Sequence, residues 1–180
     1  DEKKGDNHYN CPVVDYYPEV IRCNVKMNEG TRFLSPFLNI SNEKTFSKYF
    51  TIQMNKEGID LDERDVKRAA GLAYKALSEY KSDVEKEGER IIEKAEKENI
   101  PLVVLVGRPY HVDSEINHGI DTLLTSLGVA IITEDSVSRK EEKFRTMVLN
   151  QWTYHSRLYG AAKWVRDRKD NRTVLIHLVS

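Results

Sequence analysis

The fold of this chain is decided by residues 101–135, which read PLVVLVGRPYHVDSEINHGIDTLLTSLGVAIITED. The stretch opens with a continuous apolar run at 102–106 that ends at Gly107. A short, β-branched run of this kind is typical of a strand buried on both faces, as in a parallel sheet. A second apolar run, 129–132, ends in the polar residues 133–135. The stretch therefore predicts two parallel strands joined by a helix, a βαβ unit.

Between the two apolar runs, apolar residues recur at three- and four-residue steps, which predicts a helix. They are Ile116, Ile120, Leu123, Leu124 and Leu127. Asp113 or Ser114 is suited to cap the start of this helix, and Gly128 is suited to the left-handed position just past its end. Gly119 falls inside the predicted helix, where we expect it to permit close packing on the sheet.

Polar residues follow both predicted strands, at 108–118 and at 133–136. Open α/β sheets bind ligands beyond the carboxyl ends of their strands. The predicted helix start after Asp113 also offers free N–H groups and the positive end of the helix dipole, which suit an anion. The residues expected to line a ligand-binding cleft are Arg108, Tyr110, His111, Asp113, His118, Glu134 and Asp135.

Arg108 has two interpretations. Its guanidinium group suits a ligand phosphate or carboxylate, and it equally suits an ion pair with Glu134 or Asp135 at the neighbouring strand end. For the chain by itself we favour the ion pair, with ligand contact in the parent protein. An acid/base role for Glu134 and Asp135 is the weaker hypothesis, because Asp135 or Ser136 is suited to cap the next helix.

A metal site is a second hypothesis for the loop after the first strand. Imidazole and carboxylate ligands suit several divalent ions, and the loop contains His111, Asp113, Glu115 and His118. Their spacing matches no standard zinc pattern, and the histidines lie on either side of the predicted helix start. We therefore favour local hydrogen bonding over metal binding.

The rest of the chain supplies further predicted elements. We expect a mobile lead-in at 1–8, an extended segment at 10–18, a strand at 31–34, helices at 44–54, 62–95, 141–149 and 151–168, and a strand at 173–179. Gly88 is the weak point of the long helix. Trp152, His155 and Tyr159 recur at helical steps and are expected in the core.

These elements predict an α/β fold with a mainly parallel sheet and helices on both faces. The arrangement is a Rossmann-like or flavodoxin-like three-layer fold with one long crossover helix. Internal repeats and low-complexity linkers are absent from the sequence, so we expect a single α/β domain over residues 9–180, as a fragment of a larger protein.

The composition of the chain limits the kinds of molecule that it is expected to bind. The chain has 180 residues, 39% of them hydrophobic, and a formal net charge of −1. This charge gives no general attraction to nucleic acid or to an anionic membrane, and no apolar run approaches the length of a membrane span. Two cysteines in a sequence of cytosolic character favour a reducing compartment, so we expect a cytoplasmic protein that binds neither nucleic acid nor membrane.

Several strings in the chain carry a resemblance to a known family. They are Asn10-Cys11-Pro12-Val13-Val14, Tyr17-Pro18-Glu19, Ser35-Pro36-Phe37, Gly107-Arg108-Pro109-Tyr110-His111 with Asp113, Asn117-His118-Gly119, Thr133-Glu134-Asp135, and Gln151-Trp152-Thr153-Tyr154-His155 with Arg157-Leu158. With them the chain resembles the acyl-CoA dehydratase activase-related proteins, the 2-hydroxyacyl-CoA dehydratase activator family, in the region that follows the ATPase modules. The string from GRPYH to TED is the most specific.

The resemblance implies a role in anaerobic acyl-CoA metabolism. The chain would be a module that helps to hold an iron–sulfur cluster or docks a redox partner in ATP-driven electron transfer. The implied partners are an ATPase activator module and the acyl-CoA dehydratase subunits, and the implied cofactor is a [4Fe–4S] cluster in the parent protein. The chain alone is expected not to be catalytic, since its sequence shows neither a P-loop nor a pairing of nucleophile and base.

The two cysteines have different expected roles. Cys11 is the candidate cluster ligand implied by the resemblance, although clusters commonly need four cysteines and a structural role is equally open. Cys23 lies among apolar helix positions and is expected to be a buried structural thiol. The alternative function is an acyl-CoA or phosphate-ligand binding or regulatory module without a cluster.

Overall fold

The computed structural model describes residues 12–113 and 115–179. These residues divide into two compact units, one of Pro12–Tyr80 and one that begins at Lys81. The predicted lead-in at 1–8 and the candidate ligand Cys11 lie outside the described residues. The expectation of one domain over residues 9–180 stays a prediction.

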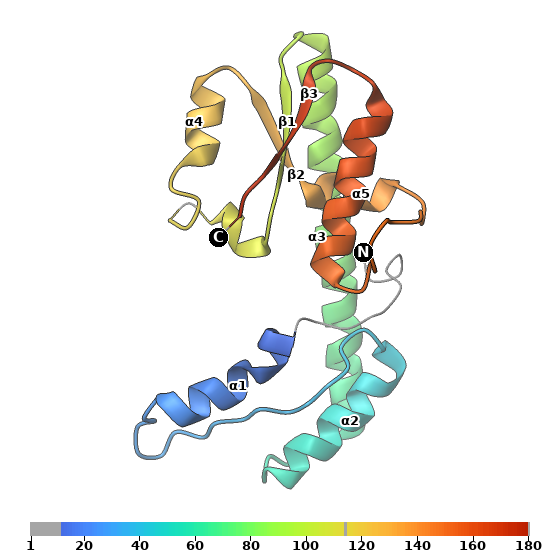
Figure 1. Ribbon diagram of the computed structural model, residues 1–180. Coiled ribbons are helices and arrows are strands. Elements are labelled where there is room, and N and C mark those ends of the chain that lie inside the picture. The colour runs from blue at the N-terminus through green and yellow to red at the C-terminus, as the bar shows by residue number, and fades with distance from the viewer. Residues whose placement is uncertain (1–11, 114, 180) are drawn as a thin grey trace. The chain divides into compact units, whose positions relative to one another are not determined.

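The unit that begins at Lys81 is built on a three-stranded parallel sheet (Figure 1). Its strands are β1 (Leu102–Val106), β2 (Ala130–Thr133) and β3 (Thr173–His177), in the order β2-β1-β3. This arrangement confirms the predicted βαβ unit. Because β1 is the middle strand, all of its residues are buried, which explains its continuous apolar sequence.

Helices cover both faces of this sheet, as predicted. The helical elements of the unit are the C-terminal part of α3 (Glu63–Lys97), η1 (Pro109–Val112), α4 (Ile120–Ser126), η2 (Glu134–Ser136), η3 (Ser138–Lys140) and α5 (Thr153–Arg168). In Figure 1, α4 lies on one side of the sheet, and α5 lies on the other with the C-terminal part of α3. The fold is α/β and consistent with a three-layer arrangement.

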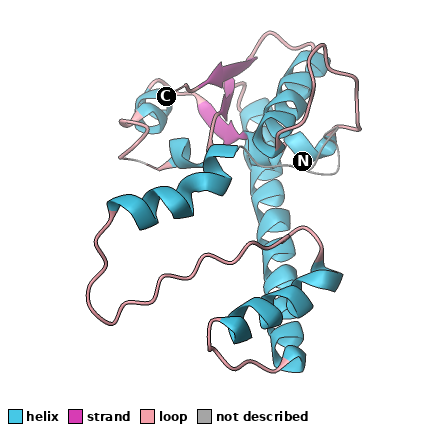
Figure 2. Ribbon diagram, turned by 60° about the horizontal axis from the view of Figure 1, so that its bottom comes forward, coloured by secondary structure: helices cyan, strands magenta, loops and turns pink. Residues whose placement is uncertain are grey.

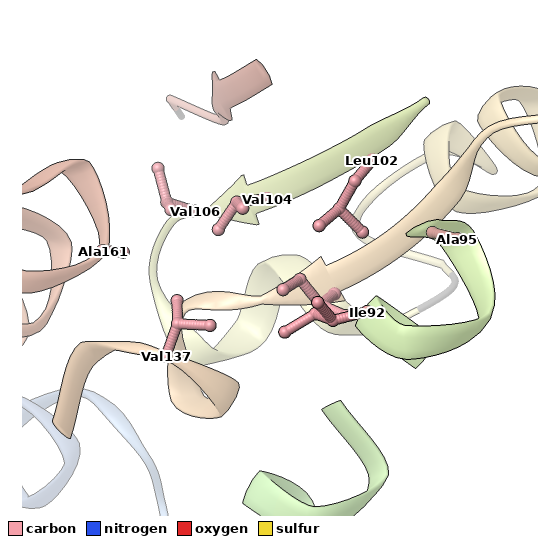
Figure 3. Close-up of a cluster of buried hydrophobic side chains, with 8 residues drawn as sticks. Ile92, Ala95, Leu102, Val104, Val106, Val137 and Ala161 are labelled. Atoms are coloured by element: carbon pink, nitrogen blue, oxygen red, sulfur yellow. The ribbon is translucent and has the colours of Figure 1, made fainter. Parts of the chain in front are cut away.

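The hydrophobic core lies between β1 and the helices α3 and α5. Figure 3 shows it with side chains contributed by β1, by both helices and by the residue that follows η2. Its buried members are Ile92, Ala95, Leu102, Val104, Val106, Ile132, Val137 and Ala161. Full burial of a valine- or leucine-sized side chain contributes about 1.5–3 kcal/mol, so this cluster is a main source of stability for the unit.

Two glycines let helices approach the segment that follows β2. A Cβ atom on Gly88 of α3 would lie 2.4 Å from the Cβ of Ser136, and one on Gly160 of α5 would lie 2.7 Å from the carbonyl oxygen of Ser138. The sequence marks Gly88 as a weak point in the helix. The structure gives its reason, because a larger residue would collide with η2.

The unit Pro12–Tyr80 differs from the sequence-based expectation in two places. Residues 12–18 belong to a helix, α1 (Pro12–Asn24), and the predicted extended segment is wrong there. Pro12 occupies the first helical position, where a missing N–H costs nothing, and Pro18 lies inside a helix that has no buried residues. The predicted strand at 31–34 is also wrong, because these residues are irregular.

The loop from α1 to α2 (Glu43–Lys56) is stabilised by side-chain contacts and not by pairing between strands. Figure 2 shows it as a continuous irregular segment. The guanidinium carbon of Arg22 lies 5.6 Å from the centroid of the Phe33 ring, and the Arg32 side chain donates a hydrogen bond to the carbonyl oxygen of Glu57. Because 31–34 is not a strand, no strand of the described sheet precedes α3 in the sequence. The long helix α3 is therefore not, as predicted, a crossover helix between two described strands, but leads into the first of them, β1.

Two helices predicted near the sheet also need correction. The helix expected after Asp113 begins only at Ile120, and Gly119 is its N-cap, with a φ of +75°. The segment 141–149 is irregular and not a helix. Gly128 has a φ of +76° just past α4, as predicted. Among the described residues, no helix has both the length and the apolar character needed to cross a membrane.

Candidate functional site

The carboxyl ends of the three strands meet at one edge of the sheet. His177, the last residue of β3, pairs in register with Val106, the last residue of β1, and the backbone N–H of Leu178 donates to the carbonyl oxygen of Val106 at 2.8 Å. Side chains from the loop after β1, from η2, from the first turns of α5 and from β3 form what we call the edge site. Its members are Arg108, Glu134, Asp135, Tyr154, His155, Arg157 and His177.

A partly buried ion pair organises one half of the edge site. Nη2 of Arg157 lies 3.0 Å from Oε1 of Glu134, and Arg157 also pairs with Asp135. Burial raises the pKa of Glu134, and the charge of Arg157 opposes that shift. The expected pairing of Arg108 with Glu134 or Asp135 is therefore wrong. The partner of both carboxylates is an arginine that α5 brings to the end of β2.

Arg108 lies instead against an aromatic ring. Its guanidinium carbon is 6.0 Å from the centroid of the Tyr154 ring, and the guanidinium carbon of Arg157 is 5.7 Å from the same centroid. Both distances fall in the range of cation–π interactions. Among the described residues, no carboxylate pairs with the half-buried Arg108.

His155 lies in the first turn of α5, and its pKa responds to Arg108 and to His177. Burial lowers the pKa of His155, and Arg108 and His177 lower it further. Its Nδ1 atom is shielded from solvent and has no hydrogen-bond partner within the described part of the chain. The prediction that Trp152, His155 and Tyr159 are core residues is wrong, since all three are only half-buried.

His111 shapes the loop after β1. The backbone N–H of Arg108 donates to Nδ1 of His111 at 2.9 Å, and a Cβ on Gly107 would lie 2.4 Å from that atom. Because Nδ1 accepts this bond, the neutral ring carries its proton on Nε2. Tyr110 is exposed and contacts the His111 ring, with the two centroids 4.6 Å apart. His111 therefore positions Arg108.

The remaining predicted cleft residues lie on an exposed turn. Oδ1 of Asp113 accepts the backbone N–H groups of Glu115 and Ile116, so Asp113 closes this turn and does not cap α4. His118 is exposed and has a left-handed φ of +55°. In the described ranges, no group of three or more histidine, cysteine, aspartate or glutamate side chains is placed to hold a metal ion.

Neither cysteine is among the described members of the edge site. Cys11 lies outside the described residues. Cys23 is exposed on α1, and the prediction that it is a buried structural thiol is wrong. Its neighbours Val20 and Ile21 are also exposed, because α1 buries none of its residues.

Of the predicted cleft residues, Arg108 follows β1, and Glu134 and Asp135 follow the neighbouring strand β2. The structure adds four residues that sequence reasoning did not select for the site. These are Tyr154, His155, Arg157 and His177. A signal for three of them was present in the string 151–158, which carries part of the family resemblance. The i, i+3 spacing of Tyr154 and Arg157 places them on one side of a helix.

A scan against protein-family models matches most of the chain. The family model described as CoA enzyme activase uncharacterised domain (DUF2229) matches residues 1–137, which include β1, β2 and η2 and stop before α5 and β3. Comparisons with curated proteins and with solved structures returned no match. Since the matched range covers most of its length, the chain belongs to this acyl-CoA dehydratase activase-related family.

Proposed function

We propose that the chain is a module of a 2-hydroxyacyl-CoA dehydratase activase-type protein. Its edge site would help to hold an iron–sulfur cluster or dock a redox partner in ATP-driven electron transfer. Membership of the activase family supports this assignment. The observation that carries it is the gathering of Arg108, His155 and His177 at the carboxyl edge of the parallel sheet, with no described carboxylate paired to Arg108.

Charge is the physical link between this edge and a redox role. An iron–sulfur cluster with thiolate ligands is anionic, and its reduction adds further negative charge. The reduction potential depends on net charge and on hydrogen bonds to the sulfur atoms. A fixed guanidinium group such as Arg108 would favour the reduced state of a cluster held nearby.

The described residues do not complete a cluster site by themselves. Clusters commonly take four cysteine ligands, and the sequence contains Cys11 and Cys23 only. Cys23 is exposed on α1, in the unit that does not contain the sheet. Cys11 is therefore the candidate ligand that this chain offers, and the ATPase activator module or the dehydratase subunits would supply the others.

Iron and acid-labile sulfide content after anaerobic reconstitution tests this proposal. The protein would be reconstituted with and without its ATPase module and dehydratase subunits, as wild type, as Cys11→Ala and as the matched control Cys23→Ala. We expect the wild type and Cys23→Ala to take up iron and Cys11→Ala to lose it. Equal iron in all three proteins, or no uptake by the wild type in any mixture, would overturn the proposal.

A second candidate function is a binding or regulatory module for an acyl-CoA or another phosphorylated ligand, without a cluster. Arg108 favours it, because a half-buried guanidinium group at a strand end without a carboxylate partner suits a phosphate. Saturable binding of a coenzyme A ester by protein that takes up no iron would select this function over the first.

A further inference from the structure

We infer that Arg108, His155 and His177 form a subsite for an oxyanion of the kind that a phosphate ester carries. The inference rests on the second candidate function and deepens it by naming the residues and the chemical group that they bind. The three side chains come from the loop after β1, from the start of α5 and from the end of β3. Segments far apart in the sequence therefore build the subsite.

Arg108 is held in place before any ligand arrives. Its backbone N–H is fixed by Nδ1 of His111, and its guanidinium group lies over the Tyr154 ring. Neither contact is an ion pair of the guanidinium group. Within the described ranges, no carboxylate accepts a hydrogen bond from its N–H groups. A fixed fork of donors binds an oxyanion with less loss of side-chain entropy than a mobile one.

His155 supplies a polar atom without a partner. Nδ1 of His155 is shielded from solvent and makes no hydrogen bond to a described residue. Buried polar atoms are normally satisfied, so this atom leaves one hydrogen bond that a ligand at the strand ends can make. His155 also lies in the first turn of α5, and the N-cap Trp152 gives that turn no side-chain hydrogen bond. The positive end of the helix dipole therefore adds to the attraction for an anion.

The charges around His155 make anion binding depend on protonation. Arg108 in the loop after β1 and His177 at the end of β3 both act to lower the pKa of His155. On α5, Tyr159 lies 6.5 Å away, ring to ring. Arg157 of the same helix is neutralised by Glu134 and Asp135 from η2. A bound oxyanion would offset the charge of Arg108, so His155 would take up a proton and donate a hydrogen bond to the ligand.

Sulfate is the first probe, because its charge is constant between about pH 5 and pH 8, the range in which histidine titrates. Calorimetric titration of the wild type should give saturable binding that weakens as the pH rises. Saturating sulfate should raise the pKa of His155, measured by NMR. Arg108→Gln should weaken sulfate binding about tenfold or more. Arg166→Gln removes an exposed arginine from α5 and should leave binding unchanged.

Inorganic phosphate, coenzyme A and dephospho-coenzyme A then identify the source of the oxyanion. Tighter binding of coenzyme A than of dephospho-coenzyme A, lost in Arg108→Gln, would place the 3′-phosphate in the subsite. Sulfate binding without coenzyme A binding would keep the subsite and remove the coenzyme A function. An absence of saturable sulfate binding, or equal binding by Arg108→Gln and wild type, would overturn the subsite.

Discussion

Arg157 of α5 lies 3.0 Å from Glu134, whose side chain is 6% exposed at the end of β2. This contact joins a residue inside the family match to one beyond it. Burial of Glu134 favours its neutral form, and the guanidinium group of Arg157 favours the charged form. The ion pair therefore helps to keep Glu134 charged at the end of β2. Because Glu134 pairs with Arg157, it is not the partner of Arg108.

Removal of Arg157 should show how much free energy the burial of a charged Glu134 side chain costs. We expect Arg157→Ala to lower the free energy of unfolding at neutral pH by about 3 kcal/mol, because a buried carboxylate loses its cation. Chemical denaturation at several pH values checks this. The loss should shrink as the pH falls, since protonation of Glu134, whose pKa is already raised by burial, removes the unpaired charge.

Two variants control this experiment. Arg166→Ala breaks an exposed ion pair with Asp167 on the same helix and should change stability little. Glu134→Gln combined with Arg157→Ala should recover part of the loss, because no charge remains buried. The explanation fails if Arg157→Ala is equally destabilising at acid and neutral pH.

Two glycines of α3 should respond in opposite ways to alanine. At Gly88 the new Cβ would meet Ser136 at 2.4 Å, and overpacking of this kind costs about 1–3 kcal/mol. At Gly71 nothing lies within 4 Å, and alanine should stabilise the helix by about 0.5–1 kcal/mol. Thermal and chemical unfolding of the two variants measures the difference.

Ser136→Gly supplies the rescue for this comparison. It removes the side chain that Gly88→Ala would strike, so it should restore part of the stability lost in that variant. Gly88→Ala that stabilises the protein as much as Gly71→Ala would show that α3 does not pack closely on η2.

The titration of His155 should report on Arg108 even without a ligand. In the wild type, burial, Arg108 and His177 hold the pKa of His155 below its ordinary value of 6.5. Arg108→Gln removes one cation and should move the pKa of His155 upward, as seen by NMR, whereas Arg166→Gln should not. A lowered pKa in the folded state means that His155 favours folding above pH 6.5, and this contribution is lost as the pH falls. An unchanged titration in Arg108→Gln would contradict the placement of the two residues.

Asp170 should make its own contribution to the free energy of unfolding, and this contribution should depend on pH. Burial raises its pKa, but hydrogen bonds from Arg168, Thr173 and the backbone of Arg172 outweigh this and hold it well below the ordinary value of 3.8. The contribution is thus present above pH 3.8 and is lost as the pH falls further. Asp170→Asn should cost about 1–3 kcal/mol at neutral pH, by loss of acceptors for the turn before β3.

Asp83→Asn is the matched control for Asp170. Its carboxylate makes an exposed ion pair with Lys86 on α3, so its loss should change stability little at any pH. Equal effects of the two substitutions would show that the turn before β3 does not depend on Asp170.

Sequence reasoning succeeded where a signal is local. The apolar run at 102–106 predicted β1 because only a middle strand is buried on both faces, and Gly128 predicted the end of α4 because left-handed backbone favours glycine. It failed at 31–34 and at 141–149, where the residue pattern suits a strand or a helix but the backbone is irregular. Propensity alone is too weak to decide such segments.

The sequence by itself determined the α/β class, the parallel βαβ unit and the strand ends after which Arg108, Glu134 and Asp135 follow, because these depend on hydrophobic pattern and strand direction. Only the tertiary structure decided that the partner of Glu134 is Arg157. It also decided that Arg108 and His177 both lower the pKa of His155. The choice between two arginines depends on where α5 begins relative to the strand ends. No local pattern of residues encodes that position, because long-range packing sets it.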